Sequence, residues 1–155
     1  MFCIFFKSTC PIHVTYLSKG ETVDALYYIE HCIKPVVKAI NRQRPKSGTL
    51  HMKFLHDNAR HHAAKLTKSQ LEEVGFKIIR HLPYSPDLSP CDFWLFDLIK
   101  RQLVDATDEE DLNRQITKVL GKIPQEEFLK TFEKWLERMQ MCITNKGDYF
   151  EHLIK

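Results

Sequence analysis

The stretch LHMKFLHDNARHH, residues 50–62, decides the fold, because a predicted strand ends within it and a helical pattern begins. Residues 50–56 alternate enough between apolar and polar side chains to predict a strand. Residues 61–74 read as a helix that stops at Gly75, and residues 76–80 read as another strand. A strand, a helix and a second strand in this order indicate an α/β fold.

The residues before this stretch extend the α/β pattern. Phe2 to Lys7 and Ile12 to Leu17 are β-branched and aromatic runs, which predict two strands that can form a hairpin. From Glu21 to Ile40, apolar residues recur at steps of three and four, which predicts a helix. Pro35 must kink or divide this helix, since proline lacks the amide hydrogen that the helix interior needs. Residues 41–48 form a basic loop.

The residues that follow the stretch predict a stiff loop and then a helix. Residues 81–90 contain three prolines, which disfavour regular structure. We expect the next helix to have Ser89 as its N-cap and Pro90 at its first position. Asp92 lies three residues after Ser89, so the pair matches a variant of the capping box.

Two further helices are predicted near the end of the chain. Thr107 and Glu110 repeat the capping signature before a helix over 108–120. The last helix is expected to begin at Pro124 and to carry a wide apolar stripe. We expect this stripe to be core or subunit interface rather than a cofactor site. Its members are Phe128, Phe132, Trp135, Met139 and Ile143.

Length and composition favour one folded domain over residues 1–155. The chain is 43% hydrophobic and 28% charged, a balance that argues against disorder. The apolar opening, Met1 to Phe6, is far shorter than the roughly 20 residues that span a bilayer. No basic residue precedes this segment as in a signal peptide, so we expect neither membrane insertion nor secretion.

The cysteines predict no structural site. There are five, widely scattered, and none forms a Cys-x-x-Cys pair. The sequence therefore indicates neither a disulfide framework nor a cysteine zinc site, and it fits a reducing compartment.

The charge is modest overall but unevenly distributed. The net charge is +3, yet residues 34–60 hold seven basic residues and one acid, and residues 105–111 hold five acids and no base. A basic surface beside one carboxylate indicates phosphate binding. The alternative is that these residues are only a solvated helix end and loop. The seven basic residues are Lys34, Lys38, Arg42, Arg44, Lys46, Lys53 and Arg60.

Asp57 and Asp92 are the candidate metal ligands. Asp57 follows an apolar strand, where side chains leave the sheet edge and can face a ligand. Asp92 lies in the first turn of a predicted helix, where the backbone dipole stabilises negative charge. Carboxylate oxygens are hard ligands that suit Mg²⁺ or Mn²⁺. Two alternatives remain: Asp57 can close an Asx turn, and Asp92 can be a capping acid.

Four histidines near these acids raise the question of a zinc site. They are His56, His61, His62 and His81. Their spacing matches no zinc pattern, so the sequence does not favour this assignment.

The two acidic motifs carry a resemblance to a known family. HDNAR at 56–60 and YSPDLSPCDFWLF at 84–96 resemble the catalytic motifs of mariner-type transposases of the Tc1/mariner superfamily. In this sequence 34 residues lie between Asp57 and Asp92, which is the family's spacing. Residues 17–40 and 123–151 also resemble the family's connector helix and C-terminal helices, so the similarity covers nearly the whole chain.

The resemblance implies a fold and an activity. The fold is an RNase H-like mixed sheet flanked by helices, and the activity is metal-dependent cleavage and strand transfer of DNA in cut-and-paste transposition. It makes Asp57 the second and Asp92 the third catalytic acid, with Mg²⁺ or Mn²⁺ as cofactor. It implies DNA as partner, a homodimer or association with full-length transposase, and a nuclear location.

The departures from the family pattern are equally specific. The first acidic residue is Glu21, so the family's first catalytic aspartate and its central strand are missing. The resemblance places that strand between the strand of residues 2–7 and the strand that ends at Asp57, so its loss leaves two unpaired edges. The family's N-terminal helix-turn-helix region is also absent. His61 stands where the family usually has proline.

Two hypotheses follow. The first is a truncated transposase catalytic domain over residues 1–155, inactive as it stands because one of three acids is missing. The second is a non-catalytic remnant that binds nucleic acid through Lys34 to Lys53 or dimerises through its aromatic helix. Metal-dependent nicking of DNA would separate the two.

Overall fold

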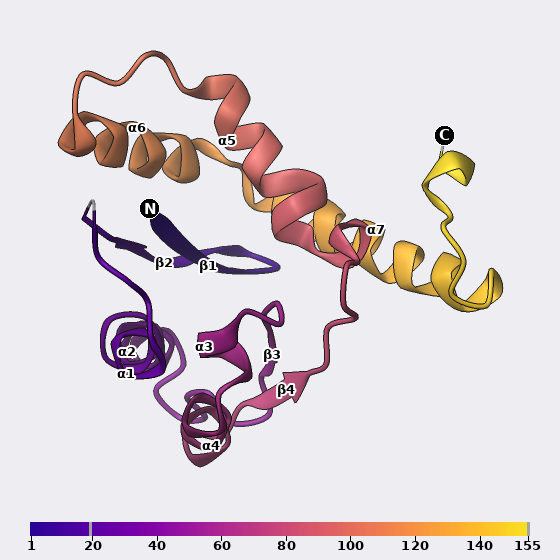
Figure 1. Ribbon diagram of the computed structural model, residues 1–155, viewed down its shortest axis with the longest axis horizontal. Helices are drawn as coiled ribbons and strands as arrows, with labels where there is room; N and C mark the ends of the chain where they lie inside the picture. Colours follow the sequence, from indigo (N-terminus) through magenta and orange to yellow (C-terminus); the bar gives the residue numbers. More distant parts are fainter. Residues whose placement is uncertain (19, 155) are drawn as a thin grey trace. The chain divides into compact units, whose positions relative to one another are not determined.

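The computed structural model describes residues 1–18 and 20–154, which form two compact units (Figure 1). The first unit contains Met1–Phe6 and Pro11–Pro83. The second contains Lys7–Cys10 and Tyr84–Lys155. Asp57 therefore lies in the first unit and Asp92 in the second.

Two strands at the start of the chain form a hairpin. β1 (Phe2–Lys7) pairs with β2 (Cys10–Tyr16), so the second strand begins two residues earlier than expected. Beyond the strand ends, the Met1 amine donates to the Leu17 carbonyl over 3.1 Å and the Leu17 amide donates to the Met1 carbonyl over 2.8 Å. This reciprocal exchange is typical of an antiparallel pair.

The predicted helix around Pro35 is divided, as expected. It consists of α1 (Ala25–Tyr27), the π-helical η1 (Tyr28–Ile33) and α2 (Lys34–Gln43). Asp24 caps the start by accepting a 2.7 Å hydrogen bond from the Tyr27 amide. The Lys34 amide bonds to the Ile29 carbonyl, five residues back, so the wide π turn comes directly before the proline that lacks an amide hydrogen.

The decisive stretch forms a parallel strand pair joined by helices. β3 (Lys53–Leu55) and β4 (Lys77–Ile79) pair in register with Phe54 opposite Ile78. Both strands are shorter than predicted. Between them lie α3 (Arg60–Ala63) and α4 (Lys65–Glu73), so the predicted helix over 61–74 is broken at Ala64, whose ψ of 140° is extended rather than helical.

The sheet is split into two two-stranded sheets, with order β1-β2 and β3-β4. Among the described residues, β1 and β3 therefore do not pair with each other. Both sheets nevertheless pack on one core, which contains Tyr28, Phe54 and Phe76 with Phe5 against it. The rings of Phe5 and Phe54 lie 6.2 Å apart between centroids. Among the described residues no strand lies between β1 and β3.

The second unit is helical. Its elements are η2 (Pro86–Leu88), η3 (Cys91–Leu95), α5 (Phe96–Gln102), α6 (Glu109–Lys122), α7 (Gln125–Thr144) and η4 (Glu151–Leu153). The α7 stripe is core at Phe128 and Trp135, as expected, whereas Ile143 is 71% exposed. Trp94 packs edge-on against Phe128 with 5.3 Å between ring centroids. No helix among the described residues is long and apolar enough to cross a membrane.

Both predicted capping boxes differ from the structure. Ser89 is not the N-cap of the helix that carries Asp92: the cap is Pro90, and no side chain caps this end. The start of α6 is capped by Asp108 instead of Thr107, one residue later than predicted. Asp108 accepts from the Asp111 amide over 2.8 Å, and Asp111 reaches back to the Thr107 amide over 3.3 Å. Several acids in a row made this register ambiguous in the sequence.

Candidate active site

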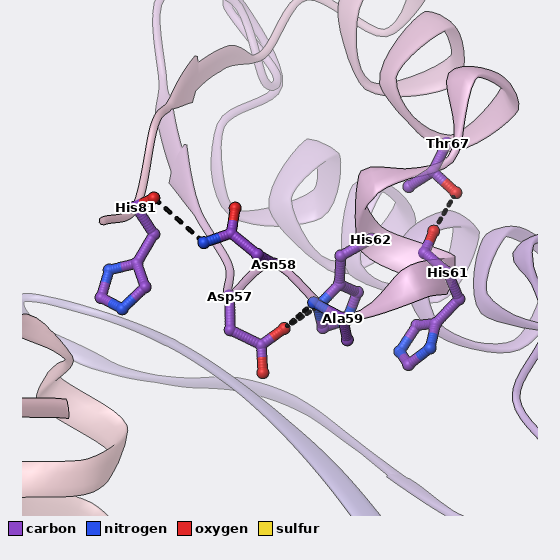
Figure 2. Close-up of polar contacts among 7 residues, drawn as sticks. All are labelled: Asp57, Asn58, Ala59, His61, His62, Thr67 and His81. Atoms are coloured by element: carbon purple, nitrogen blue, oxygen red, sulfur yellow. Dashed lines mark hydrogen bonds and ion pairs between the residues drawn. The ribbon is translucent and has the colours of Figure 1, made fainter. Parts of the chain in front are cut away.

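Asp57 lies just beyond the carboxyl end of β3, and its two carboxylate oxygens have different surroundings (Figure 2). Oδ1 accepts a 2.9 Å hydrogen bond from the Ala59 amide and lies 2.5 Å from Nδ1 of His62. The bond to Ala59 is the Asx turn that the sequence left open as an alternative. Oδ2 has no hydrogen bond with the described residues, and the side chain is 65% exposed. The turn therefore occupies one oxygen and leaves the other available to a ligand.

His62 donates to Asp57 as a neutral imidazole. Burial lowers the pKa of His62, although the Asp57 carboxylate opposes this effect. A neutral ring beside a carboxylate oxygen must carry its proton on Nδ1, the nitrogen that faces Asp57. The contact is therefore a hydrogen bond rather than a full ion pair at neutral pH.

The carboxyl group of Asp57 has a lowered pKa. Partial burial raises the pKa, but the hydrogen bonds from the Ala59 amide and from His62 outweigh burial. Hydrogen bonds to a charged carboxylate stabilise that form. Asp57 is therefore an anion at neutral pH, which is the form that can bind a cation.

Aromatic rings pack around His62. Its ring lies 4.7 Å from that of His56, 4.5 Å from that of Tyr28 and 4.2 Å from that of His61, between centroids. Burial lowers the pKa of His56 to about 4, and its Nδ1 is buried without a hydrogen-bond partner among the described residues. The three histidine rings therefore pack together next to Asp57, and His62 is the one that contacts it. The sequence analysis named His62 only as one of four histidines without a zinc pattern, and nothing in the sequence indicated that Tyr28 packs beside the site.

Two further hydrogen bonds fix the loop that carries Asp57. The Asn58 side-chain amide donates to the His81 carbonyl over 3.1 Å, which ties the end of β3 to the segment after β4 (Figure 2). The buried Thr67 hydroxyl donates to the His61 carbonyl over 2.6 Å. These bonds satisfy backbone carbonyls, one of them where the helix breaks at Ala64.

Asp92 lies in the first turn of η3 and is exposed. Its backbone amide donates to the Ser89 carbonyl over 2.9 Å, but its carboxylate has no hydrogen bond or ion pair with the described residues. The alternative that Asp92 is a capping acid is therefore wrong. Its carboxylate is left for solvent or a ligand.

The two acids fit a divalent cation in chemical type. Asp57 supplies one unbonded, ionised oxygen and Asp92 an unpartnered carboxylate, both hard ligands of the kind that Mg²⁺ and Mn²⁺ take. Within the described part of the chain, no three histidine, cysteine, aspartate or glutamate side chains form a group that could hold a metal. The two acids belong to different units, so each is described within its own unit.

The basic residues predicted to contact phosphates all lie in the first unit. Lys34, Lys38 and Arg42 are four residues apart along α2 and line a groove of about 550 Å³ beside α4. Lys34 forms an ion pair with Glu30 over 2.5 Å. The other four lie elsewhere in the unit: Arg44 at the end of α2, Lys46 in the turn after it, Lys53 in β3 and Arg60 in α3.

The chain is similar to two curated proteins, although no protein-family model matches it. It is 28% identical to Mariner Mos1 transposase of Drosophila mauritiana over 155 residues, which covers 97% of this chain and 45% of that protein. It is 27% identical to histone-lysine N-methyltransferase SETMAR of Homo sapiens over 156 residues, which covers 97% of this chain and 22% of that protein. The chain thus spans less than half the length of both relatives.

Solved structures give the same picture. The Mos1 transposase catalytic domain with raltegravir and Mg matches with a TM-score of 0.89 and 28% identity, over 97% of this chain and 76% of that chain. The Mos1 paired-end complex with Mn matches with a TM-score of 0.89 and 29% identity, over 97% of this chain and 44% of that chain. These matches confirm the resemblance that the HDNAR and YSPDLSPCDF motifs predicted. The chain is therefore similar in sequence and structure to the catalytic domain of a mariner transposase, and it has the RNase H-like fold of that domain.

Proposed function

We propose that this chain is the larger part of a transposase catalytic domain in which Asp57 and Asp92 are the second and third catalytic acids. The observation that carries the proposal is that each of these carboxylates keeps at least one oxygen without a protein partner among the described residues. The similarity to Mos1 over 97% of the chain supports it.

We propose Mg²⁺ or Mn²⁺ as the cofactor. The solved structures of the Mos1 catalytic domain include one with Mg and one with Mn, which supports this choice. A divalent cation would activate the attacking water or 3′ hydroxyl and neutralise charge on the phosphodiester. Asp57 and Asp92 would each supply an oxygen ligand to such ions. Ala59 and His62 hold the other oxygen of Asp57, so they orient the unbonded one.

The chain alone should be inactive. Its first acidic residue is Glu21, which lies after both strands of the hairpin, so no aspartate precedes Asp57 on a central strand. Phosphoryl transfer depends on positioning and charge neutralisation. Loss of one of three carboxylates should therefore reduce cleavage by orders of magnitude.

A plasmid-nicking assay tests this assignment. Purified chain is incubated with supercoiled DNA and Mn²⁺, beside Asp57→Ala and Asp92→Ala variants. We expect weak metal binding and no cleavage above the variants. Robust nicking that survives Asp92→Ala would show that the site has been misassigned.

We also propose that the basic residues from Lys34 to Arg60 bind DNA phosphates without sequence preference. The exposure of Lys34, Arg42 and Lys46 supports this role, as does the similarity to Mos1 in its paired-end complex with left transposon end. Lys38 and Arg42 are the best candidates, because neither has an ion pair among the described residues, whereas Lys34 does.

Salt dependence of DNA binding tests this surface. Replacing Lys38 and Arg42 together by alanine should make the slope of log K against log salt shallower by roughly 2, since each lost phosphate contact removes about 0.9. Lys118→Ala with Lys122→Ala, two exposed residues of α6, is the matched control. A marked preference for transposon-end DNA over random duplex would contradict nonspecific binding.

The partners and location follow from the proposed reaction. The paired-end complexes of Mos1 support a homodimer, or association with full-length transposase, as the assembly in which this chain would work. Action on chromosomal DNA in a eukaryote would place it in the nucleus.

A dimerising remnant without catalysis is the alternative function. It is favoured by α7, which exposes Leu129, Leu136 and Ile143 at seven-residue steps, so they lie on one side of the helix. If this stripe associates, Leu136→Lys should abolish a concentration-dependent increase in sedimentation coefficient. Lys134→Leu, elsewhere on the same helix, should not.

A further inference from the structure

Arg138 joins three segments of the second unit. Its side chain is only 15% exposed, and Nη1 donates to the Asp87 carbonyl over 3.0 Å and to the Glu151 carboxylate over 2.9 Å. The guanidinium also lies over the Phe93 ring, with Cζ 4.4 Å from the ring centroid. One side chain of α7 therefore contacts the loop before Asp92, the residue after it and the end of the chain.

Asp92 depends on such contacts of its neighbours because its own side chain makes no hydrogen bond or ion pair among the described residues. No side chain caps the start of η3, and the Asp92 carboxylate has no protein partner there. Its position follows from its neighbours on both sides, where Arg138 donates to the Asp87 carbonyl and lies over the Phe93 ring. A planar guanidinium suits this task, since it can donate at its edge and stack on an aromatic ring with its face.

The buried charge of Arg138 has its own support. Glu151 accepts from Arg138, and the Tyr149 hydroxyl donates to the other Glu151 oxygen over 2.9 Å. The Arg138 guanidinium, followed by the Tyr149 hydroxyl, lowers the pKa of Glu151. A buried charge that loses its partner is strongly destabilising. Glu151 and Tyr149 are therefore needed to keep the Arg138 side chain in contact with the loop that carries Asp92.

We propose that Arg138 is a positioning residue for Asp92 and that Tyr149 and Glu151 hold Arg138 in place. The role of Asp92 as a metal ligand rests on the proposed function, but the geometry of the Arg138 contacts does not. Coupling between residues 149–151 and the Asp92 loop is the consequence, although these segments are nearly 60 residues apart in the chain.

Amide hydrogen exchange tests the positioning directly. The reporters are amides that hydrogen-bond within the loop, at Leu88, Ser89 and Phe93. In Arg138→Met, which keeps the apolar stem but loses the guanidinium, these amides should exchange at least tenfold faster. Arg138→Lys, which keeps the charge, should be intermediate. Lys134→Met on the same helix, an exposed residue, is the matched control and should have no effect.

Mn²⁺ supplies the second measurement. Paramagnetic broadening of the Phe93 amide reports Mn²⁺ at Asp92 even when binding is weak. Arg138→Met should need at least fivefold more Mn²⁺ for the same broadening, with partial recovery in Arg138→Lys. If the unaltered chain shows no broadening at all, the metal role in the proposed function fails, and the exchange measurement still decides the positioning.

Two results would overturn the proposal. One is unchanged exchange of the loop amides in Arg138→Met. The other is equal acceleration of amides throughout α6 and α7, which would mean that Arg138 only stabilises the whole unit. Should Arg138→Met fail to fold, Glu151→Gln and Tyr149→Phe replace it. Both must loosen the loop amides, and wild-type exchange in both variants would refute the coupling.

Discussion

The two oxygens of the Asp57 carboxylate differ in what they can bind. Oδ1 closes the turn to Ala59 and accepts from His62, while Oδ2 has no partner among the described residues. A carboxylate held on one side keeps its orientation without a ligand. A structural turn and a metal-binding role are therefore compatible at this residue, because they use different oxygens.

Replacing His62 by phenylalanine should raise the pKa of Asp57. Phenylalanine can keep the packing on Tyr28 and His56 but cannot donate to the carboxylate. Since His62 helps to lower this pKa, its loss shifts the titration of Asp57 upward. NMR titration of the Asp57 side-chain carboxyl carbon measures the change. His61→Phe is the control, and equal titration curves for all three proteins would contradict the role of His62.

Thr67 should contribute to stability through one buried hydrogen bond. Its hydroxyl, fully buried, donates to the His61 carbonyl over 2.6 Å. Thr67→Val keeps the shape but leaves that carbonyl without its donor, which should cost about 1–2 kcal/mol of unfolding free energy. Urea unfolding measures this. Thr117→Val removes an exposed hydroxyl from α6 and should change stability by less than about 0.5 kcal/mol.

The sequence was sufficient to predict the two acids, Asp57 and Asp92, but not the residues that hold them in place. Asp57 and Asp92 were identifiable from their motifs and from their places at element boundaries. Arg138 was not, because an arginine on an amphipathic helix is usually a solvated residue, and its partners Asp87 and Glu151 are far away in the chain. His62 was named only as a histidine without a metal pattern.

At the scale of elements, some helix boundaries could be predicted from single residues and others could not. Pro35 was predicted to kink or divide its helix, and the helix changes from the π-helical η1 to α2 directly before it, because the missing amide hydrogen is a property of one residue. The break at Ala64 was not predicted, since alanine favours helices; the Thr67 hydroxyl bonds to the His61 carbonyl across the break. Cap positions were wrong by one residue where several suitable residues are adjacent.

Two glycines in different contexts should respond oppositely to alanine. Gly75 ends α4 with a φ of +88°, in the left-handed region, so Gly75→Ala should destabilise the protein by about 1 kcal/mol. Gly121 lies in the last turn of α6 with nothing within 4 Å of an added Cβ. Gly121→Ala should therefore stabilise it by about 0.5 kcal/mol. Thermal unfolding of both variants measures the two signs, and a shift in the same direction would contradict the argument.

At the scale of the molecule, the feature that matters most is the split sheet. β1-β2 and β3-β4 share one core, yet each contains only two strands. Two-stranded sheets are marginal on their own. The α/β class followed from the sequence, and the family resemblance predicted that the described residues hold no strand between β1 and β3. The sequence could not say whether β1 and β3 would pair directly, because that depends on how the core packs without the strand.

The last prediction is that a strand supplied between β1 and β3 will restore the sheet. An aspartate-bearing strand from an intact mariner transposase, fused with a flexible linker before Phe2, can pair with the free edges of both strands. It would give β1 and β3 a hydrogen-bonding neighbour between them, in addition to β2 and β4. We expect a higher melting temperature and protection of β1 and β3 amides from exchange.

Replacing the aspartate on the added strand distinguishes the effect of the strand on stability from the effect of the carboxylate on DNA hydrolysis. Replacing the new aspartate by alanine should leave the gain in melting temperature intact, because pairing and burial do not require the charge. Mn²⁺-dependent hydrolysis of pre-nicked transposon-end DNA, with the DNA-binding domain added separately, should require this aspartate, Asp57 and Asp92 together. A fused strand that fails to raise the melting temperature would contradict the prediction that β1 and β3 can pair with a strand between them. A stable fusion without hydrolysis would mean that this chain has lost more than its first aspartate, and the non-catalytic remnant would then be the better description.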